Sequence, residues 1–158
     1  AKVSHSANAI AISTGLLDSP RRHVRTYAAW ALGRMGSRDL TDAAPVYQIT
    51  PAIEKLVLLL EKEVDTTAFK LMLYAIGELC DQRGKDPNLI VSPAIASSVL
   101  SKVKNIQSKN GFIQSTTQKI PQTFDMVIDM LSGKSLAIEQ ERVLLSLRSK
   151  LDDDGLGD

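Results

Sequence analysis

Hydrophobic and polar residues alternate along most of this chain with the period of an α-helix. Between residues 24 and 35 the apolar positions recur at spacings of three and four, and they are Val24, Tyr27, Ala28, Ala31, Leu32 and Met35. These side chains fall within about 100° of arc on a helix, which predicts an amphipathic helix with one face in a core. Ser19 and Pro20 match an N-cap and a first helical position, and Gly36 matches the residue that follows a helix end.

The same pattern predicts six further helices, at residues 5–17, 52–63, 66–80, 94–106, 121–131 and 136–151. Thr50-Pro51 and Ser92-Pro93 repeat the Ser-Pro start signal, and Asp65 is a candidate N-cap. The polar segments 37–48 and 81–89 have the composition of loops. The last helix is predicted to bury the side that carries Ile138, Val143, Leu144 and Leu147. The predicted fold class is therefore all-α.

Parts of the sequence repeat with a period near 43 residues. ALGRMG at 31–36 corresponds to AIGELC at 75–80, TPAIEKLVLLL at 50–60 to SPAIASSVLSK at 92–102, and NAIAISTGLL at 8–17 to PAIEKLVLLL at 51–60. Such a period with two helices per unit predicts stacked helical pairs. We expect one domain, 1–158, with repeats at about 5–36, 50–80 and 92–131, a C-terminal helix at 136–151 and an acidic tail at 152–158.

The stretch VRTYAAWALGRMG, residues 24–36, resembles the second (B) helix of HEAT-like repeats of the bacterial type, similar to those of phycobilin lyases. That family's pattern is an Asp-Pro turn, Val-Arg, paired alanines and Ala-Leu-Gly. The resemblance extends over residues 50–80, where Ala68-Phe69 replaces Val-Arg, and is partial beyond 92. It implies an α-α superhelix of about three helical pairs whose B helices line the concave side. It implies no single activity, because related proteins serve as scaffolds, enzymes and nucleic-acid binders.

Composition and charge exclude several function classes. Nineteen basic and eighteen acidic residues leave a net charge of +1, so overall charge gives no argument for binding nucleic acid or an anionic membrane. No apolar run approaches the roughly 18 residues that cross a bilayer. The single cysteine, Cys80, lies in an apolar stripe, which predicts a buried thiol and favours a reducing compartment, the cytoplasm. We expect the chain to be part of a larger protein.

Catalytic and metal-binding patterns are absent from the sequence. His5 and His23 have no cysteine or carboxylate at the spacing of metal ligands, and no glycine-rich phosphate loop or serine elbow occurs. Asp152 to Asp154 are expected to form a solubilising tail. We therefore expect no catalytic residues, no metal and no cofactor, and a protein that is not an enzyme.

Candidate binding residues lie on the B-helix side opposite the apolar stripe. On the first B helix they are His23, Thr26, Trp30 and Arg34, and a shift of 44 residues adds Thr67, Lys70, Tyr74 and Glu78. Trp30 thus corresponds to Tyr74. One interpretation is a concave surface with aromatic hot spots that binds another protein. The other is that both rings pack against neighbouring repeats. The predicted site is His23, Thr26, Trp30, Arg34, Lys70, Tyr74 and Glu78.

Two further functions stay open as alternatives to a non-catalytic protein–protein interaction scaffold. Basic residues cluster at Arg21, Arg22, Arg25, Arg34 and Arg38, and again at Lys102, Lys104, Lys109 and Lys119, as a nucleic-acid-binding groove would require. A solvated surface explains the same clusters, and Arg25 is expected to have a structural role with Asp18 or Asp65. The family resemblance leaves a phycobilin-lyase-like enzyme subunit as the second alternative.

Overall fold

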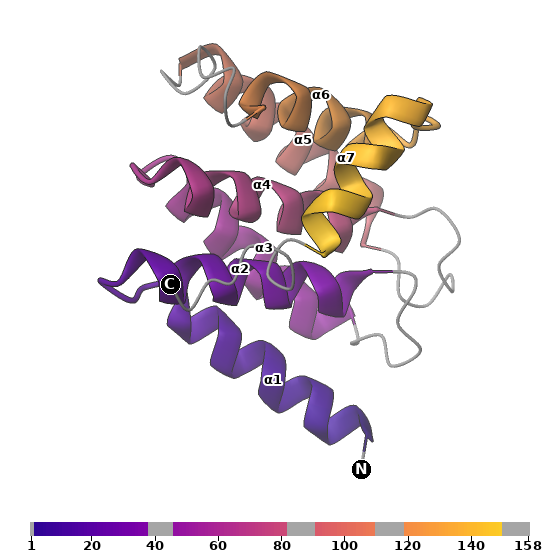
Figure 1. Ribbon diagram of the computed structural model, residues 1–158. Coiled ribbons are helices and arrows are strands. Elements are labelled where there is room, and N and C mark those ends of the chain that lie inside the picture. Colours follow the sequence, from indigo (N-terminus) through magenta and orange to yellow (C-terminus); the bar gives the residue numbers. More distant parts are fainter. Residues whose placement is uncertain (1, 38–45, 82–90, 110–118, 150–158) are drawn as a thin grey trace.

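The computed structural model describes residues 2–37, 46–81, 91–109 and 119–149, and this part of the chain is helical without strands (Figure 1). Its seven helices are α1 (Lys2–Leu16), α2 (Arg22–Gly36), α3 (Val46–Leu60), α4 (Thr66–Cys80), α5 (Pro93–Lys109), α6 (Ile120–Leu131) and α7 (Ile138–Arg148). The predicted all-α class is confirmed. No described helix is long and apolar enough to cross a membrane.

The helices form two layers with a seventh helix across one of them. Helices α2, α4 and α6 lie side by side as a front layer, and α3 and α5 pack behind them, with α1 below α2 and against α3 as the third helix of this back layer (Figure 1). Each back helix contacts the front helix that follows it in sequence. Helix α7 crosses the front layer and contacts α2, α4 and α6. The face of the front layer that α7 crosses is called the front face below.

The core is centred on α4, the middle helix of the front layer. Every residue from Ala68 to Cys80 is buried, because α4 packs against α2, α3, α6 and α7. A helix enclosed on all sides needs apolar residues around its whole circumference, and this segment has them. Phe69 contacts Phe124 of α6 with ring centroids 5.7 Å apart. Cys80, the one cysteine of the sequence, is buried, as the sequence predicts.

Two glycines let α2 approach α4 closely. A Cβ atom on Gly33 would lie 2.3 Å from Cε2 of Tyr74, and one on Gly36 would lie 2.7 Å from Cδ2 of Leu79. Helix α2 therefore has two buried sides, and their buried residues are Thr26, Ala28, Ala29, Leu32, Gly33 and Gly36. The predicted single stripe is wrong at Tyr27, which is 55% exposed. The prediction for Gly36 is also wrong, because Gly36 lies within the helix at this close contact.

Several predicted helix ends are confirmed. Asp65 caps α4 by accepting a hydrogen bond from the Ala68 N–H at 2.9 Å. Ser92 accepts one from the Ile95 N–H at 3.2 Å before α5. Helix α6 ends at Leu131, and Gly133, two residues later, has a left-handed φ of 73°, which glycine adopts readily after a helix end.

Other predicted boundaries are wrong. Helix α2 begins at Arg22 with Arg21 at the N-cap, so Ser19 is not the cap. The Ser19 hydroxyl accepts a hydrogen bond from the Arg21 N–H, which precedes the helix. Helix α3 begins at Val46 and contains Pro51, so residues 46–48 are helical and Thr50 is not a cap. The extension buries Ile49, and this burial offsets the hydrogen bond that Pro51 cannot donate.

The remaining differences are at the ends of the chain's other helices. Helix α1 begins three residues before its predicted start, α3 ends three residues early, and α5 extends to Lys109. Helix α7 is shorter than predicted and Ile138 is 74% exposed, because α7 buries only Leu144 and Leu147. Residues 38–45 of the predicted loop at 37–48, residues 82–89 of the predicted turn and the acidic tail lie outside the described residues.

Candidate functional site: the front face crossed by α7

A buried carboxylate lies where α4 meets α7. Glu78 is 1% exposed and lies on the C-terminal half of α4. Its Oε2 accepts hydrogen bonds from Nε of Arg148 at 2.8 Å and from the Tyr74 hydroxyl at 2.9 Å. Its Oε1 accepts from Nη2 of Arg148 at 3.0 Å. The Arg148 guanidinium therefore binds the Glu78 carboxylate in a bidentate manner, which is a strong geometry for such an ion pair.

Because Glu78 is buried, the stability of its carboxylate depends on these hydrogen bonds. A carboxylate removed from water is stable only when it is paired and hydrogen-bonded, and Arg148 and Tyr74 both provide donors to Glu78. Burial is the largest cause that raises the pKa of Tyr74, and the nearby Glu78 carboxylate raises it further. Tyr74 thus keeps its proton and remains a hydrogen-bond donor to Glu78.

Trp30 of α2 also binds the C-terminal end of α7. Its indole Nε1 donates to the backbone carbonyl of Arg148 at 2.9 Å, across 118 residues of sequence. Its ring lies against Tyr27 with centroids 5.9 Å apart and planes tilted by 59°. Arg148 therefore contacts the front layer twice, through its side chain at Glu78 and through its carbonyl at Trp30.

The structure brings three of the predicted site residues together and separates the others. Trp30, Tyr74 and Glu78 meet around Arg148. Tyr74 is fully buried over Gly33, as the packing interpretation of the aromatic pair describes, whereas Trp30 is half-buried. As residues that bind a partner, the seven remain a prediction.

The other four predicted residues have different surroundings. His23 is exposed at the start of α2, and Arg34 is half-buried near its end. Thr26 is buried, and its hydroxyl donates to the Arg22 carbonyl at 2.8 Å. Lys70 is 9% exposed and lines a cavity of about 200 Å³ between the front layer and α7.

Sequence reasoning missed two residues of this site. Tyr27 was placed in the core, but its spacing from His23, Trp30 and Arg34 puts it on the same side of α2 as they are. Arg148 contacts partners 70 and 118 residues away, and the periodicity of a single helix carries no information about such a contact.

A second buried ion pair is structural. The Arg25 guanidinium donates to both carboxylate oxygens of Glu63, at 2.7 and 2.8 Å, and to the carbonyls of Ser19 and Pro20, at 3.0 and 3.1 Å. It joins the start of α2 to the turn between α3 and α4. The predicted partners of Arg25 are wrong: Asp65 pairs with Arg22 at 3.7 Å, and Asp18 pairs with Lys55.

This pair shifts the pKa of both groups. Burial alone would raise the pKa of Glu63, but the hydrogen bonds from Arg25 and from the N–H groups of Asp65 and Val64 lower it below its ordinary value. The hydrogen bond to Glu63 is the largest cause that raises the pKa of Arg25, against a smaller lowering by burial. Both shifts favour the charged pair in the folded protein.

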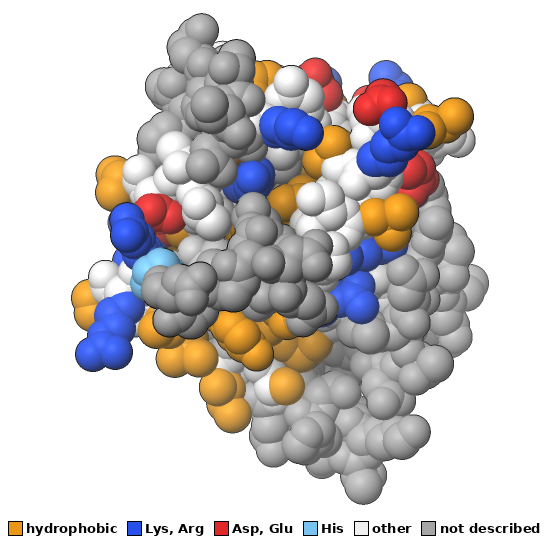
Figure 2. Space-filling view, viewed as in Figure 1, with side chains coloured by type: hydrophobic (Ala, Val, Ile, Leu, Met, Phe, Trp, Pro, Cys, Tyr) orange, Lys and Arg blue, Asp and Glu red, His pale blue; other side chains and the backbone are white. Residues whose placement is uncertain are grey.

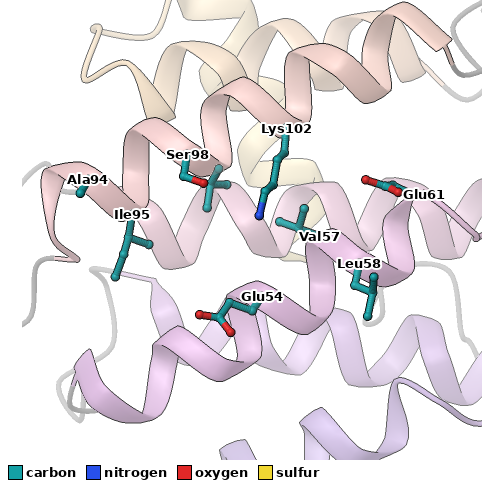
Figure 3. A pocket seen from close by; sticks show the side chains of 9 residues that line it. Glu54, Val57, Leu58, Glu61, Ala94, Ile95, Ser98 and Lys102 are labelled. Atoms are coloured by element: carbon teal, nitrogen blue, oxygen red, sulfur yellow. The ribbon is translucent and has the colours of Figure 1, made fainter.

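The back layer carries an open groove between α3 and α5 (Figure 3). Its volume is about 470 Å³, and its floor includes the buried side chains of Val57 and Val99. In Figure 3 Lys102 points from α5 toward α3, with Glu54 and Glu61 along the α3 side. The groove thus has an apolar floor and rim charges of both signs.

The basic residues are distributed over several elements. Arg21 and Arg22 are exposed at the start of α2, Lys104 is exposed on α5, and Arg25 is paired with Glu63. Lys102 and Lys109 line cavities that also contain the carboxylate Glu61. In Figure 2 basic and acidic side chains are interspersed on the visible face, and hydrophobic ones gather at its lower edge over α1. Arg38 lies outside the described residues, as does the side chain of His5.

Within the described ranges, no cluster of three or more His, Cys, Asp or Glu side chains could hold a metal ion. The chain was compared with protein-family models, with curated proteins and with solved structures, and none of the three comparisons gives a match.

Proposed function

We propose that this chain is a non-catalytic protein–protein interaction scaffold that binds a partner protein on its front face. In this proposal the pairs α1–α2, α3–α4 and α5–α6 are three units of a HEAT-like solenoid in the cytoplasm, and the front face is its concave side. The repeated spacing near 43 residues and the contact of each back helix with the next front helix support the solenoid.

One observation carries the binding proposal: the front face already holds a helix. Helix α7 lies across α2, α4 and α6 and is fixed by a buried ion pair at Glu78 and a hydrogen bond at Trp30. Aromatic residues with a paired charge in a desolvated centre are typical of hot spots in protein interfaces. A surface with this composition suits a protein partner better than a nucleic acid, which needs a basic surface.

Site-specific photo-crosslinking in the native cell tests this proposal. A benzophenone amino acid replaces Tyr27, which is exposed beside Trp30, and in a matched control it replaces Ile12, which is 63% exposed on α1. We expect residue 27 to form a defined adduct with one protein and residue 12 to form none. Equal adducts at both positions, or an adduct with nucleic acid in place of protein, would contradict the proposal.

A further inference from the structure

Helix α7 buries fewer side chains than any of the helices α2 to α6. Only Leu144 and Leu147 of its residues are buried, whereas Ile138 and Leu145 are 74% and 58% exposed. The residues that connect it to α6, from Ser132 to Ala137, are exposed except for the half-buried Leu136. The cavity that Lys70 lines with Val143 and Leu147 lies beneath α7. Helix α7 thus covers the front face without filling it.

The front face is chemically suited to one kind of occupant. Arg148 reaches Glu78 from α7, so the carboxylate is on the side of α4 that faces α7. A buried carboxylate without a cation would be costly, so any helix that replaces α7 must itself provide a cation at this point. Arginine fits best, because its planar fork can donate to both carboxylate oxygens. Trp30 then accommodates the backbone at the end of that helix through its N–H.

From these contacts we infer that the front face is a receptor for an amphipathic helix of the partner protein, and that α7 is an internal mimic of that helix. The helix carries two leucines three residues apart followed directly by an arginine, the pattern of Leu144, Leu147 and Arg148. The leucines enter the apolar surface and the arginine pairs with Glu78 beside Tyr74. This inference rests on the proposed function and specifies its partner.

Because α7 is covalently attached, it competes strongly with a free helix for the front face. A tethered helix acts at an effective concentration in the millimolar range, so a free helix of equal intrinsic affinity cannot displace it at micromolar concentration. The unmodified chain therefore binds a free helix weakly, and a chain whose α7 has been released binds it tightly.

The test uses the full chain and a fluorescent peptide of residues 134–149, KSLAIEQERVLLSLRS. In the release variant, Leu144→Asp with Leu147→Asp removes the two buried contacts of α7. The matched control, Ile138→Asp with Leu145→Asp, changes the same helix at exposed positions. We expect the release variant to bind the peptide at least tenfold more tightly than the unmodified chain, and the control to behave as the unmodified chain does.

A second peptide, with alanine in place of the arginine equivalent to Arg148, tests the cation. We expect it to bind the release variant at least tenfold more weakly than the first peptide. Equal binding of the two peptides would overturn the role of Glu78, and no binding of either would overturn the receptor. A dimer of the unmodified chain that disappears in the release variant would make the occupant a second copy and also overturn the proposal.

Two further outcomes separate this inference from its premise. If the release variant does not fold, the milder Arg148→Ala chain is used with the first peptide, and absence of tighter binding there overturns the inference. A protein adduct at residue 27 together with no peptide binding would keep the proposed function and remove the helical partner. Peptide binding without any adduct would contradict the proposed function and, with it, the assignment of the peptide-binding surface to a partner protein.

Discussion

Individual residues set the distance between the front helices. Gly33 lies beneath the ring of Tyr74, and that ring cannot move aside easily because it is fully buried and its hydroxyl donates to Glu78. The same residue therefore controls both the approach of α2 to α4 and the position of the aromatic side chain beneath the front face.

A comparison of two glycines tests this role. Gly33→Ala is expected to lower the free energy of unfolding by about 2 kcal/mol, because the new methyl group overpacks the contact with Tyr74. Gly15 has no neighbour within 4 Å of an added Cβ, so Gly15→Ala is expected to raise the free energy of unfolding by about 0.5 kcal/mol through helix propensity. Urea denaturation measures both. A stabilised Gly33→Ala chain would show that the close contact is absent in solution.

The Arg25–Glu63 pair gives a pH dependence with a defined sign. Because the pKa of Glu63 is lowered on folding, its contribution is complete above the ordinary value of 4.5 and is lost as the pH falls through the folded value. Glu63→Gln leaves Arg25 without its carboxylate and is expected to cost about 3 kcal/mol at pH 7, and less as the pH falls below 4.5.

The control for that experiment is Glu139→Gln, which removes an exposed pair with Arg142. It is expected to change the free energy of unfolding by less than about 1 kcal/mol at either pH. Urea denaturation of the three chains at pH 7 and pH 4 provides the comparison. A cost of Glu63→Gln that stays constant or grows toward low pH would contradict the assigned cause of the pKa shift.

Among the helices, α4 and α7 differ most in how much of their surface is buried. The whole of α4 from Ala68 onward is buried, whereas α7 buries two leucines and is otherwise held by polar contacts of Arg148 and Gln140. Segments with few buried contacts open at low free energy, and core helices open only with the whole protein. We therefore expect α7 to open independently.

Hydrogen exchange tests this expectation. Amides of α7 should exchange faster than those of α4, and Arg148→Ala should speed exchange in α7 at least about tenfold while α4 is unchanged. The control, Arg142→Ala, alters an exposed arginine of the same helix and should leave both helices as they were. If α4 and α7 lost protection together in Arg148→Ala, α7 would belong to the core.

Local signals predicted some elements well and others badly, for physical reasons. Helix α4 was predicted with its observed ends, because Asp65 is a true cap and the apolar positions after it continue without interruption. The start of α3 was misplaced because a proline signal is local, whereas the burial of Ile49 depends on tertiary packing. For the site, the spacing by 44 residues related Trp30 to Tyr74, but no local pattern indicated that Arg148 joins them.

On the scale of the whole molecule, the two layers of helices form the front face, and α7 of the same chain lies across it. The front layer presents Trp30, Tyr74 and Glu78 from α2 and α4, and the return of the chain across them brings Arg148 to Trp30 and to Glu78, which also accepts from Tyr74. The arrangement joins residues of α2, α4 and α7 into one surface. It also means that access to this surface depends on how often α7 is released.

Competition between α7 and a partner protein for the front face is tested most directly by the yield of protein adduct from the crosslinker at residue 27. This yield is compared between the unmodified chain and the Leu144→Asp, Leu147→Asp chain. We expect the same partner in both chains and at least a tenfold higher yield when α7 is released, because the tethered competitor is gone. An unchanged or lower yield, or no protein adduct in either chain, would contradict it.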